Sequence, residues 1–278
     1  MRKYIIFTLY FISIFGSAQT ELVFDKKFVQ SEDKWVAFPA DSSGSYNLGF
    51  IYIDSQAGLT FDYEGSFKID ENGKYNFKRR EIDGSMKYRL KPNNILVAFI
   101  PEIKFSELGI QKVPDWLKFY KEDEHTVERQ YRWGYMYNGW GECEKALEFL
   151  NSAYLLNPKY EGLKVELAYS YNCLKNYDKA IEILMQSIKE EPVTAYTIKE
   201  LIFSQAKNGN LQDAENTFNL FDSKISDKSY KPENAYNILQ GYYLKKDHVN
   251  FYRWIKESNI QSDKRFQPYV EQMIANLK

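Results

Sequence analysis

The sequence predicts an α+β protein with two parts, a small antiparallel β domain followed by an α-solenoid of paired helices. Three observations predict it. Apolar residues tend to alternate from Leu22 to about Val113, which is the period of a strand with one buried face. Beyond Pro114 their spacing becomes helical and stays so to the C-terminus. In this second part, small and apolar residues recur at a fixed period, and a period of this kind indicates stacked repeats.

The first residues have the layout of an export signal. Two basic residues precede an apolar run over 4–15 and three small residues that end at Ala18, which is the order found in a secretory signal peptide, here 1–18. The run is shorter than the roughly 20 residues that a membrane-spanning helix needs, so cleavage after Ala18 is favoured over an uncleaved anchor. The sequence therefore predicts a periplasmic or secreted protein that begins at Gln19 and has no integral membrane segment.

Composition and charge narrow the class of protein. Hydrophobic residues make up 44% and aromatic residues 17% of the chain, which excludes a disordered protein. The formal net charge of −1 becomes −3 without residues 1–18, because two cations and no acidic residue are lost. A nearly neutral chain gives no electrostatic argument for binding nucleic acid or an anionic membrane. We expect no nucleic-acid partner.

The β-rich domain is predicted over residues 19–113. Apolar residues alternate in the runs 59–63, 67–69, 75–77 and 86–90. Turn formers separate these runs, as at 70–73, where Gly73 can adopt the positive φ that closes a hairpin. The segments 49–61 and 65–77 both read as strand, turn and strand, which shared turn chemistry explains as well as a duplication does. Residues 114–126 follow as a linker or short helix.

The period of the helical part carries a resemblance to a known family. Matching positions are Gly134 and Ala168; Tyr137 and Tyr171; Ala146, Ala180 and Ala214; Leu150, Leu184 and Phe218; and Pro158 and Pro192. This pattern of small residue, Tyr, Ala, large apolar residue and closing Pro resembles the tetratricopeptide repeat (TPR) family. The resemblance implies a helical repeat domain over 127–278, with three helical hairpins at about 127–160, 161–194 and 195–228 and a degenerate cap over 229–278 that ends in a helix.

The repeat pattern has a physical reason. Each unit is two closely crossing antiparallel helices, and small residues such as Gly134, Ala146 and Ala168 let the helix axes approach. One hairpin cannot bury its apolar face alone, and about three must stack before a continuous core forms. The third copy is looser, because Ile202 and Gln205 replace the small residue and the Tyr, and the closing Pro is missing.

In the resembled family, the first helix of each pair lines a concave groove. The groove positions carried over to this sequence are Tyr131, Tyr135, Asn138, Tyr169, Asn172, Lys199, Phe203 and Lys207. Aromatic rings supply apolar contact area, and Asn both donates to and accepts from a peptide backbone. Packing between repeats explains the aromatic residues equally well.

The two cysteines favour a disulfide, because Cys143 and Cys173 form an even count in a chain predicted to be exported. Cys143 begins the second helix of the first hairpin, and Cys173 ends the first helix of the second hairpin. These helices are expected to be antiparallel neighbours, so the two ends meet. Two buried thiols are the alternative.

No motif in the sequence indicates catalysis or metal binding. The two histidines, His125 and His248, have no further ligand at metal-binding spacing, and no phosphate loop, dinucleotide-binding glycine pattern or nucleophile motif occurs. Chance accounts for a carboxylate pair such as Asp62 and Glu64 among 38 acidic residues. We expect a non-enzymatic protein without metal or cofactor.

These observations predict an exported TPR-type interaction or adaptor module of the cell envelope, which binds an extended peptide or a partner protein in the groove of its helices. The alternative is a glycan-binding or glycan-processing envelope protein with its site on the β domain. Aromatic rings clustered with carboxylates on a solvent-facing side of the sheet favour the alternative, and an exposed concave face on the helices favours the adaptor. The fold serves many partners and does not identify this one.

Overall fold

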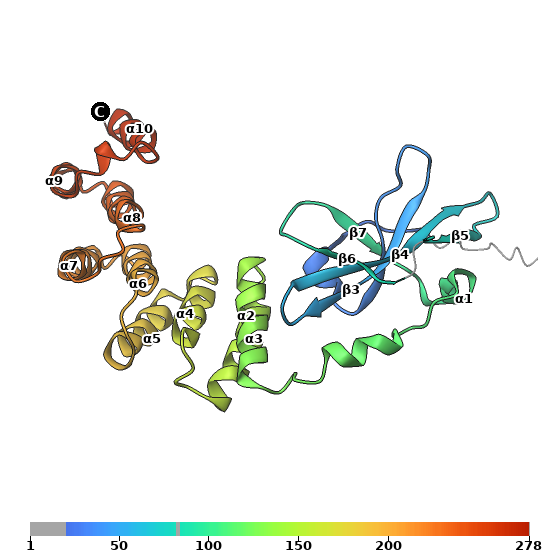
Figure 1. Ribbon diagram of the computed structural model, residues 1–278. Coiled ribbons are helices and arrows are strands. Elements are labelled where there is room, and N and C mark those ends of the chain that lie inside the picture. The colour runs from blue at the N-terminus through green and yellow to red at the C-terminus, as the bar shows by residue number, and fades with distance from the viewer. Residues whose placement is uncertain (1–20, 82–83, 278) are drawn as a thin grey trace, which may run out of the picture. The chain divides into compact units, whose positions relative to one another are not determined.

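The computed structural model describes residues 21–81 and 84–277. The predicted signal peptide, 1–18, with its cleavage site after Ala18, lies outside the described residues. An antiparallel β-sheet is followed by a stacked array of helices, so the predicted α+β class is confirmed (Figure 1). The chain divides into two compact units with a boundary after Leu117, and residues 54–58 belong to the second unit.

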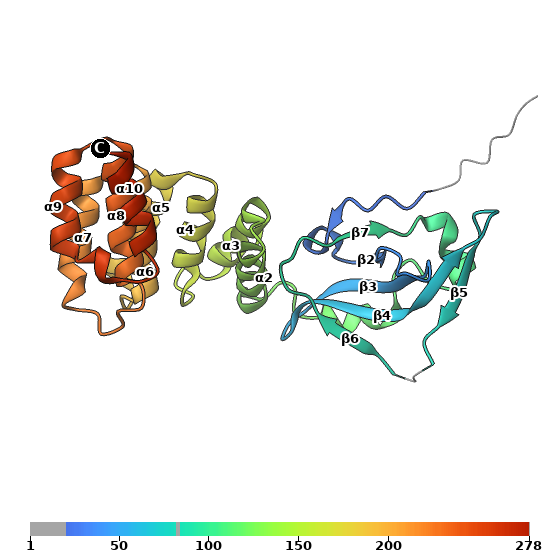
Figure 2. The ribbon, with the colours of Figure 1, turned by 90° about the horizontal axis from the view of Figure 1, so that it is seen from above.

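Seven strands among the described residues form the sheet, in the order β1-β7-β2-β3-β4-β5, with β6 also paired to β4. They are β1 Lys26–Lys27, β2 Lys34–Ala37, β3 Tyr46–Asp54, β4 Gly58–Ile69, β5 Tyr75–Arg79, β6 Met86–Arg89 and β7 Leu96–Phe99 (Figure 2). The predicted runs 59–63 and 67–69 are one continuous strand, so the two hairpins predicted from the sequence share β4. Gly73 closes the second hairpin with a φ of 74°.

One side of the sheet is covered by the segment that leads towards the helices. This segment contains α1, Phe105–Leu108, and 3₁₀ turns at Glu102–Lys104 and Asp115–Tyr120. Trp116 packs edge-on against Phe50 and Tyr52, with ring centroids 5.8 and 4.9 Å apart, and Leu117 is buried. The β unit therefore extends into the segment predicted as a linker, because these apolar side chains complete its core.

The helical unit runs from α2 to α10 in the described part of the chain (Figure 1). Its helices are α2 Val127–Gly139, α3 Cys143–Leu156, α4 Leu163–Cys173, α5 Tyr177–Glu190, α6 Ala195–Lys207, α7 Leu211–Asp222, α8 Lys231–Leu244, α9 His248–Ser258 and α10 Gln267–Asn276. The pairs α2/α3, α4/α5 and α6/α7 each fall within one predicted repeat. Gly141, Lys175 and Gly209, which hold the same position in successive repeats, close these three hairpins with φ of 75°, 61° and 84°.

Small residues lie where the helices approach most closely, as the sequence predicts. Ala146, Ala168, Ala180 and Ala214 are all fully buried. A Cβ added to Gly134 on α2 would lie 2.3 Å from Leu150 Cγ on α3, so only glycine fits between these helices without a shift. The axes of the first hairpin are therefore held at a distance that a single methyl group would change.

A disulfide joins Cys143, at the start of α3, to Cys173, at the end of α4, with the Cα atoms 6.3 Å apart. Cys143 is buried and Cys173 is exposed. The bond connects the second helix of one hairpin to the first helix of the next, which is the pairing that the antiparallel arrangement predicts. Such a bond persists only in an oxidising environment, and it therefore indicates a compartment other than the reducing cytoplasm.

Gly134→Ala is expected to destabilise the protein by about 1–3 kcal/mol, because the added methyl group overpacks the α2–α3 contact. Gly139→Ala is the matched control, since it lies on the same helix and a Cβ there meets nothing within 4 Å. Denaturant unfolding measures both. A Gly134→Ala protein as stable as the Gly139→Ala protein would contradict the close approach of these helices.

Reduction of the disulfide is expected to lower the melting temperature. The loop between Cys143 and Cys173 spans 30 residues of sequence, for which the chain-entropy treatment assigns roughly 3.5 kcal/mol of stabilisation. Calorimetry with and without reductant measures the change, and the Cys143→Ser, Cys173→Ser double variant serves as the control that no longer responds to reductant. Two free thiols in the unreduced, unfolded protein would overturn the expectation.

Candidate functional site

A row of aromatic side chains follows the first helices of successive hairpins. Helices α2, α4, α6 and α8 pack one against the next. We call this row the aromatic face, and its members are Tyr131 and Tyr135 on α2, Tyr169 on α4, Tyr196 and Phe203 on α6, and Tyr230 at the start of α8. Ring centroids are 6.4 Å apart for Tyr131 and Tyr135, and 6.2 Å apart for Tyr196 and Tyr230. The face therefore spans four helices that are far apart in the sequence.

The aromatic residues chosen from the sequence are in part accessible. Tyr135 is 59% exposed, and Tyr131, Tyr169 and Phe203 are half-buried. Burial raises the pKa of Tyr131, and the neighbouring Glu166 carboxylate raises it further. Tyr135 is thus exposed and the other three rings are partly accessible, which is the exposure of residues that line a contact surface.

The two asparagines chosen from the sequence lie inside the helical unit and not on its surface. Asn138 and Asn172 are only 3% and 5% exposed. The Asn138 amide donates to Glu166 Oε2 at 2.9 Å and accepts from the Ser170 hydroxyl at 2.7 Å. Their carboxamides face inwards because they connect consecutive first helices.

The same set of bonds recurs one repeat later. Asn172 donates to Glu200 Oε2 at 2.8 Å, and the Ser204 hydroxyl donates to Asn172 Oδ1 at 2.7 Å. We call the two sets the polar ladder; its members are Asn138, Glu166, Ser170, Asn172, Glu200 and Ser204. The ladder links α2 to α4 and α4 to α6 through groups that are buried and paired. It places two carboxylates directly below the aromatic face.

The two carboxylates differ in their neighbours. Glu200 forms an ion pair with Lys199, whose Nζ lies 2.7 Å from Oε1. Glu166 forms no ion pair with any described residue, although it is only 4% exposed. Burial raises the pKa of Glu166 to about 7, the Asn138 amide opposes this rise, and the charge of Glu200 adds to it. Glu166 is therefore a buried acid that titrates near neutral pH.

The two lysines chosen from the sequence also differ. Burial disfavours the charge of Lys199, but the Glu200 carboxylate outweighs it and the pKa of Lys199 is raised. Burial lowers the pKa of Lys207, whose Nζ donates to Gln240 Oε1 and lies 5.5 Å from the Phe203 ring centroid. Lys199 is thus committed to an internal ion pair, whereas Lys207 is exposed and has no carboxylate partner among the described residues.

Several residues of this region were missed in the sequence. Glu166, Glu200 and Tyr196 were not selected, and neither was Asn237 on α8, whose buried Nδ2 has no hydrogen-bond partner. The repeat period relates Glu166 to Glu200 and Asn138 to Asn172. A search for repeated polar residues, in addition to small and apolar ones, would have found the ladder.

The β unit contains a separate aromatic hollow of about 340 Å³ on the side of the sheet opposite Trp116. It is lined by Phe38, Asn47, Phe61, Tyr63, Tyr88 and Leu90. Tyr88 is 50% exposed, and the lining contains no carboxylate. The acidic pair noted in the sequence is engaged elsewhere, since Asp62 lies 3.4 Å from Arg80 and Glu64 lies 3.1 Å from Arg79.

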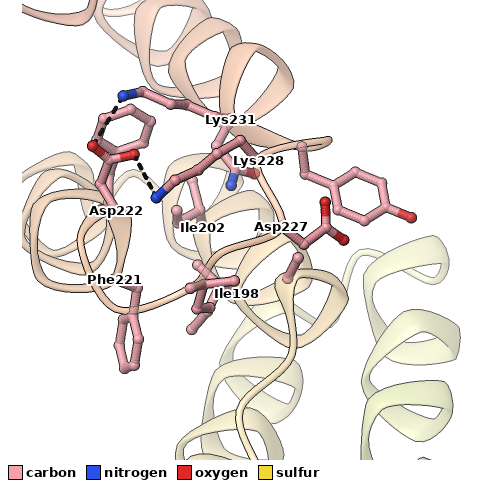
Figure 3. A pocket seen from close by; sticks show the side chains of 12 residues that line it. Ile198, Ile202, Phe221, Asp222, Asp227, Lys228 and Lys231 are labelled. Atoms are coloured by element: carbon pink, nitrogen blue, oxygen red, sulfur yellow. Dashed lines mark hydrogen bonds and ion pairs between the residues drawn. The ribbon is translucent and has the colours of Figure 1, made fainter.

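A small cavity lies between α6, α7 and α8 (Figure 3). Ile198, Ile202 and Phe221 line it, and Asp222 closes its rim through ion pairs with Lys228 and Lys231 at 3.5 and 2.9 Å. Its volume of about 30 Å³ is enough for a water molecule but not for an organic ligand. We assign it to packing.

Glu166→Gln is expected to stabilise the protein at pH 8 but not at pH 4.5. The folded-state pKa of about 7 lies above the unfolded value of about 4.3, so the folded state keeps its proton to a higher pH, and stability falls as the pH rises from about 4.3 to about 7. The gain at pH 8 is at most about 4 kcal/mol. Glu200→Gln is the control from the next repeat, and it should destabilise at pH 8 because Lys199 loses its partner. Equal effects of the two substitutions at every pH would contradict the assignment.

The comparisons with known proteins add no relationship to this geometry. No protein-family model matches the chain, and no curated protein matches it. No helix in the described part of the chain is long and apolar enough to cross a membrane. Among the described residues, no three His, Cys, Asp or Glu side chains gather into a cluster that could hold a metal ion.

Proposed function

We propose that this protein is an exported, non-enzymatic interaction module whose helical unit is of the TPR type, and that it binds an extended segment of a partner protein on its aromatic face. The observation that carries the proposal is the row of partly exposed rings along α2, α4 and α6. Clustered aromatic residues on a surface are unfavourable in water and are enriched where proteins bind each other.

Hydrogen-bonding capacity beside the rings supports an extended peptide as the bound segment. Lys207 is exposed, and its ammonium group pairs only with the neutral Gln240. Donors of this kind suit the carbonyl groups of an extended backbone. Tyr135, which is 59% exposed, adds a hydroxyl at the other end of the same face, and a hydroxyl can both donate and accept a hydrogen bond.

The export part of the proposal rests on two independent features. The layout of residues 1–18 is that of a secretory signal peptide. The disulfide between Cys143 and Cys173 requires an oxidising compartment. A periplasmic or secreted location satisfies both, and we propose a role within a cell-envelope assembly.

The second candidate function is glycan binding at the aromatic hollow of the β unit. The rings of Tyr63 and Tyr88 favour it, because sugar rings stack on accessible aromatic side chains. The lining lacks the carboxylates that usually accept hydrogen bonds from sugar hydroxyls. We therefore rank it below the aromatic face.

Replacing Tyr135, Tyr169 and Phe203 together by Ala is expected to abolish partner capture while the protein stays folded. One ring is lost from each first helix, and none of the three is fully buried. If the rings were buried in the core, each truncation would instead cost about 3–5 kcal/mol, and the three together would remove most or all of the roughly 5–15 kcal/mol of stability of a typical domain. Circular dichroism measures folding, and quantitative cross-linking in an extract of the native envelope measures capture.

The matched control removes two exposed rings of the helical unit that lie outside the aromatic face, Tyr252 on α9 and Tyr269 on α10. This control should bind as the wild type does. A folded triple variant that captures the same partners would refute the proposal and would direct attention to the hollow around Tyr88. Loss of the cooperative melt in the triple variant would show that the rings serve the core.

A further inference from the structure

Two steps of the aromatic face are copies of one arrangement. The step from α4 to α6 contains Val165, Glu166 and Tyr196. The step from α6 to α8 contains Lys199, Glu200 and Tyr230, each at the matching position one repeat later. Both carboxylates accept from the asparagine of the polar ladder in the same way. The two copies can therefore be compared position by position.

The second copy holds an ammonium group. Lys199 Nζ lies 2.7 Å from Glu200 Oε1 and 3.8 Å from Glu233 Oε1. It also lies 5.6 and 5.9 Å from the ring centroids of Tyr196 and Tyr230, within the range of a cation–π interaction. Two tyrosine rings and a buried carboxylate thus bind a lysine side chain in this scaffold.

The first copy has the carboxylate and the rings but lacks the lysine. Val165 occupies the position of Lys199. Gly162 occupies the position of Tyr196, and the Tyr131 hydroxyl comes within 3.0 Å of where a Cβ on Gly162 would lie, so the Tyr131 side chain fills that place. Glu166 accepts from the Asn138 amide and from the Tyr196 hydroxyl. A carboxylate can accept about four hydrogen bonds, so acceptor capacity remains.

The charge of the surrounding groups favours a cation. Glu166, Glu200 and Glu233 contribute three negative charges when ionised, whereas Lys199 and the more distant Arg265, beside Glu233, contribute two positive charges. Lys199 lies one repeat before Glu233, so the first copy has a lysine at the position where the second copy has Glu233. The positive charge of Lys199 lowers the affinity of the first copy for another cation. The ion pair between Lys199 and Glu200 already neutralises this charge.

We propose that the first copy binds the ammonium group of a lysine side chain on the extended partner segment, between Tyr131 and Tyr196 and against Glu166. This inference rests on the proposed function and specifies one side chain of the bound segment. The lysine enters the place that Lys199 fills one repeat later. The partner is accordingly a protein with a basic residue in its bound segment, and not an acidic peptide.

The experiment is an NMR titration of the full mature chain at pH 8, with Nα-acetyl-lysine methylamide as the probe. Glu166 is ionised at this pH, because its pKa is about 7. We expect saturable shifts of the Tyr131 and Tyr196 ring signals. The same compound acetylated at Nε carries no charge and should produce no shifts, and the methylamide of acetyl-arginine shows whether any cation suffices.

Two substitutions test the site from within. Val165→Lys supplies the missing ammonium from the chain itself and should weaken binding of the probe at least about tenfold, because the site is then occupied. Val165 is buried in an apolar cluster with Leu201, so Val165→Met, with a long side chain and no charge, is the control for overpacking and should bind the probe more tightly than Val165→Lys does. Glu166→Gln removes the carboxylate without adding bulk and should weaken binding by a similar factor, so that the test stands even if Val165→Lys does not fold.

The outcomes separate this inference from the proposed function. Unchanged probe binding in Val165→Lys and Glu166→Gln, or equal binding of the Nε-acetylated probe, overturns the lysine site. If partner capture nevertheless depends on Tyr135, Tyr169 and Phe203, the proposed function stands without it. If the probe binds as expected but partner capture does not depend on Tyr135, Tyr169 and Phe203, the lysine site is supported and the proposed peptide-binding function is refuted.

Discussion

The arrangement of the helical unit depends on the polar ladder between successive first helices. Apolar packing alone tolerates small shifts of one helix along another, whereas a buried carboxamide or carboxylate without a partner costs free energy. Helices α2, α4 and α6 therefore have one register in which Asn138 meets Glu166 and Asn172 meets Glu200. Each step is closed by a serine hydroxyl, from Ser170 or Ser204, so the asparagine is satisfied on both sides.

The ladder also sets the electrostatics of the aromatic face. It holds two carboxylates under a layer of tyrosine rings, where burial works against ionisation. At the second step Lys199 forms an ion pair with Glu200, whereas at the first step Glu166 has no ion pair with any described residue and is affected by the charge of Lys199 only at longer range. A buried acid with a raised pKa and no cation of its own is unfavourable for stability, and such groups tend to lie at functional sites. The feature that positions the helices thus also creates the strongest candidate for recognition.

The ladder ends after α6, and the packing changes there. Ala206, Asn234 and Ile238 occupy the positions of the next asparagine, glutamate and serine. Ala206 and Ile238 belong to a large apolar cluster that continues through Trp254 into α10, and Asn234 Oδ1 is left without a hydrogen-bond partner. The last hairpin and α10 therefore close the stack by apolar burial, which matches the looser pattern of the third repeat and the cap in the sequence.

The sequence by itself determined the α+β class, the three hairpins and their cap, the small residues at the helix crossings and the approach of Cys143 to Cys173. These follow from periodicity and from residue size, which are properties of positions along one chain. Tertiary structure alone decided that β4 is a single strand, that Trp116 belongs to the β unit, and that Asn138 and Asn172 are buried. It also decided that Glu200 forms an ion pair with Lys199 while Glu166 forms none among the described residues. These features depend on distances between side chains from different helices or strands, and such distances exist only once those elements have packed together.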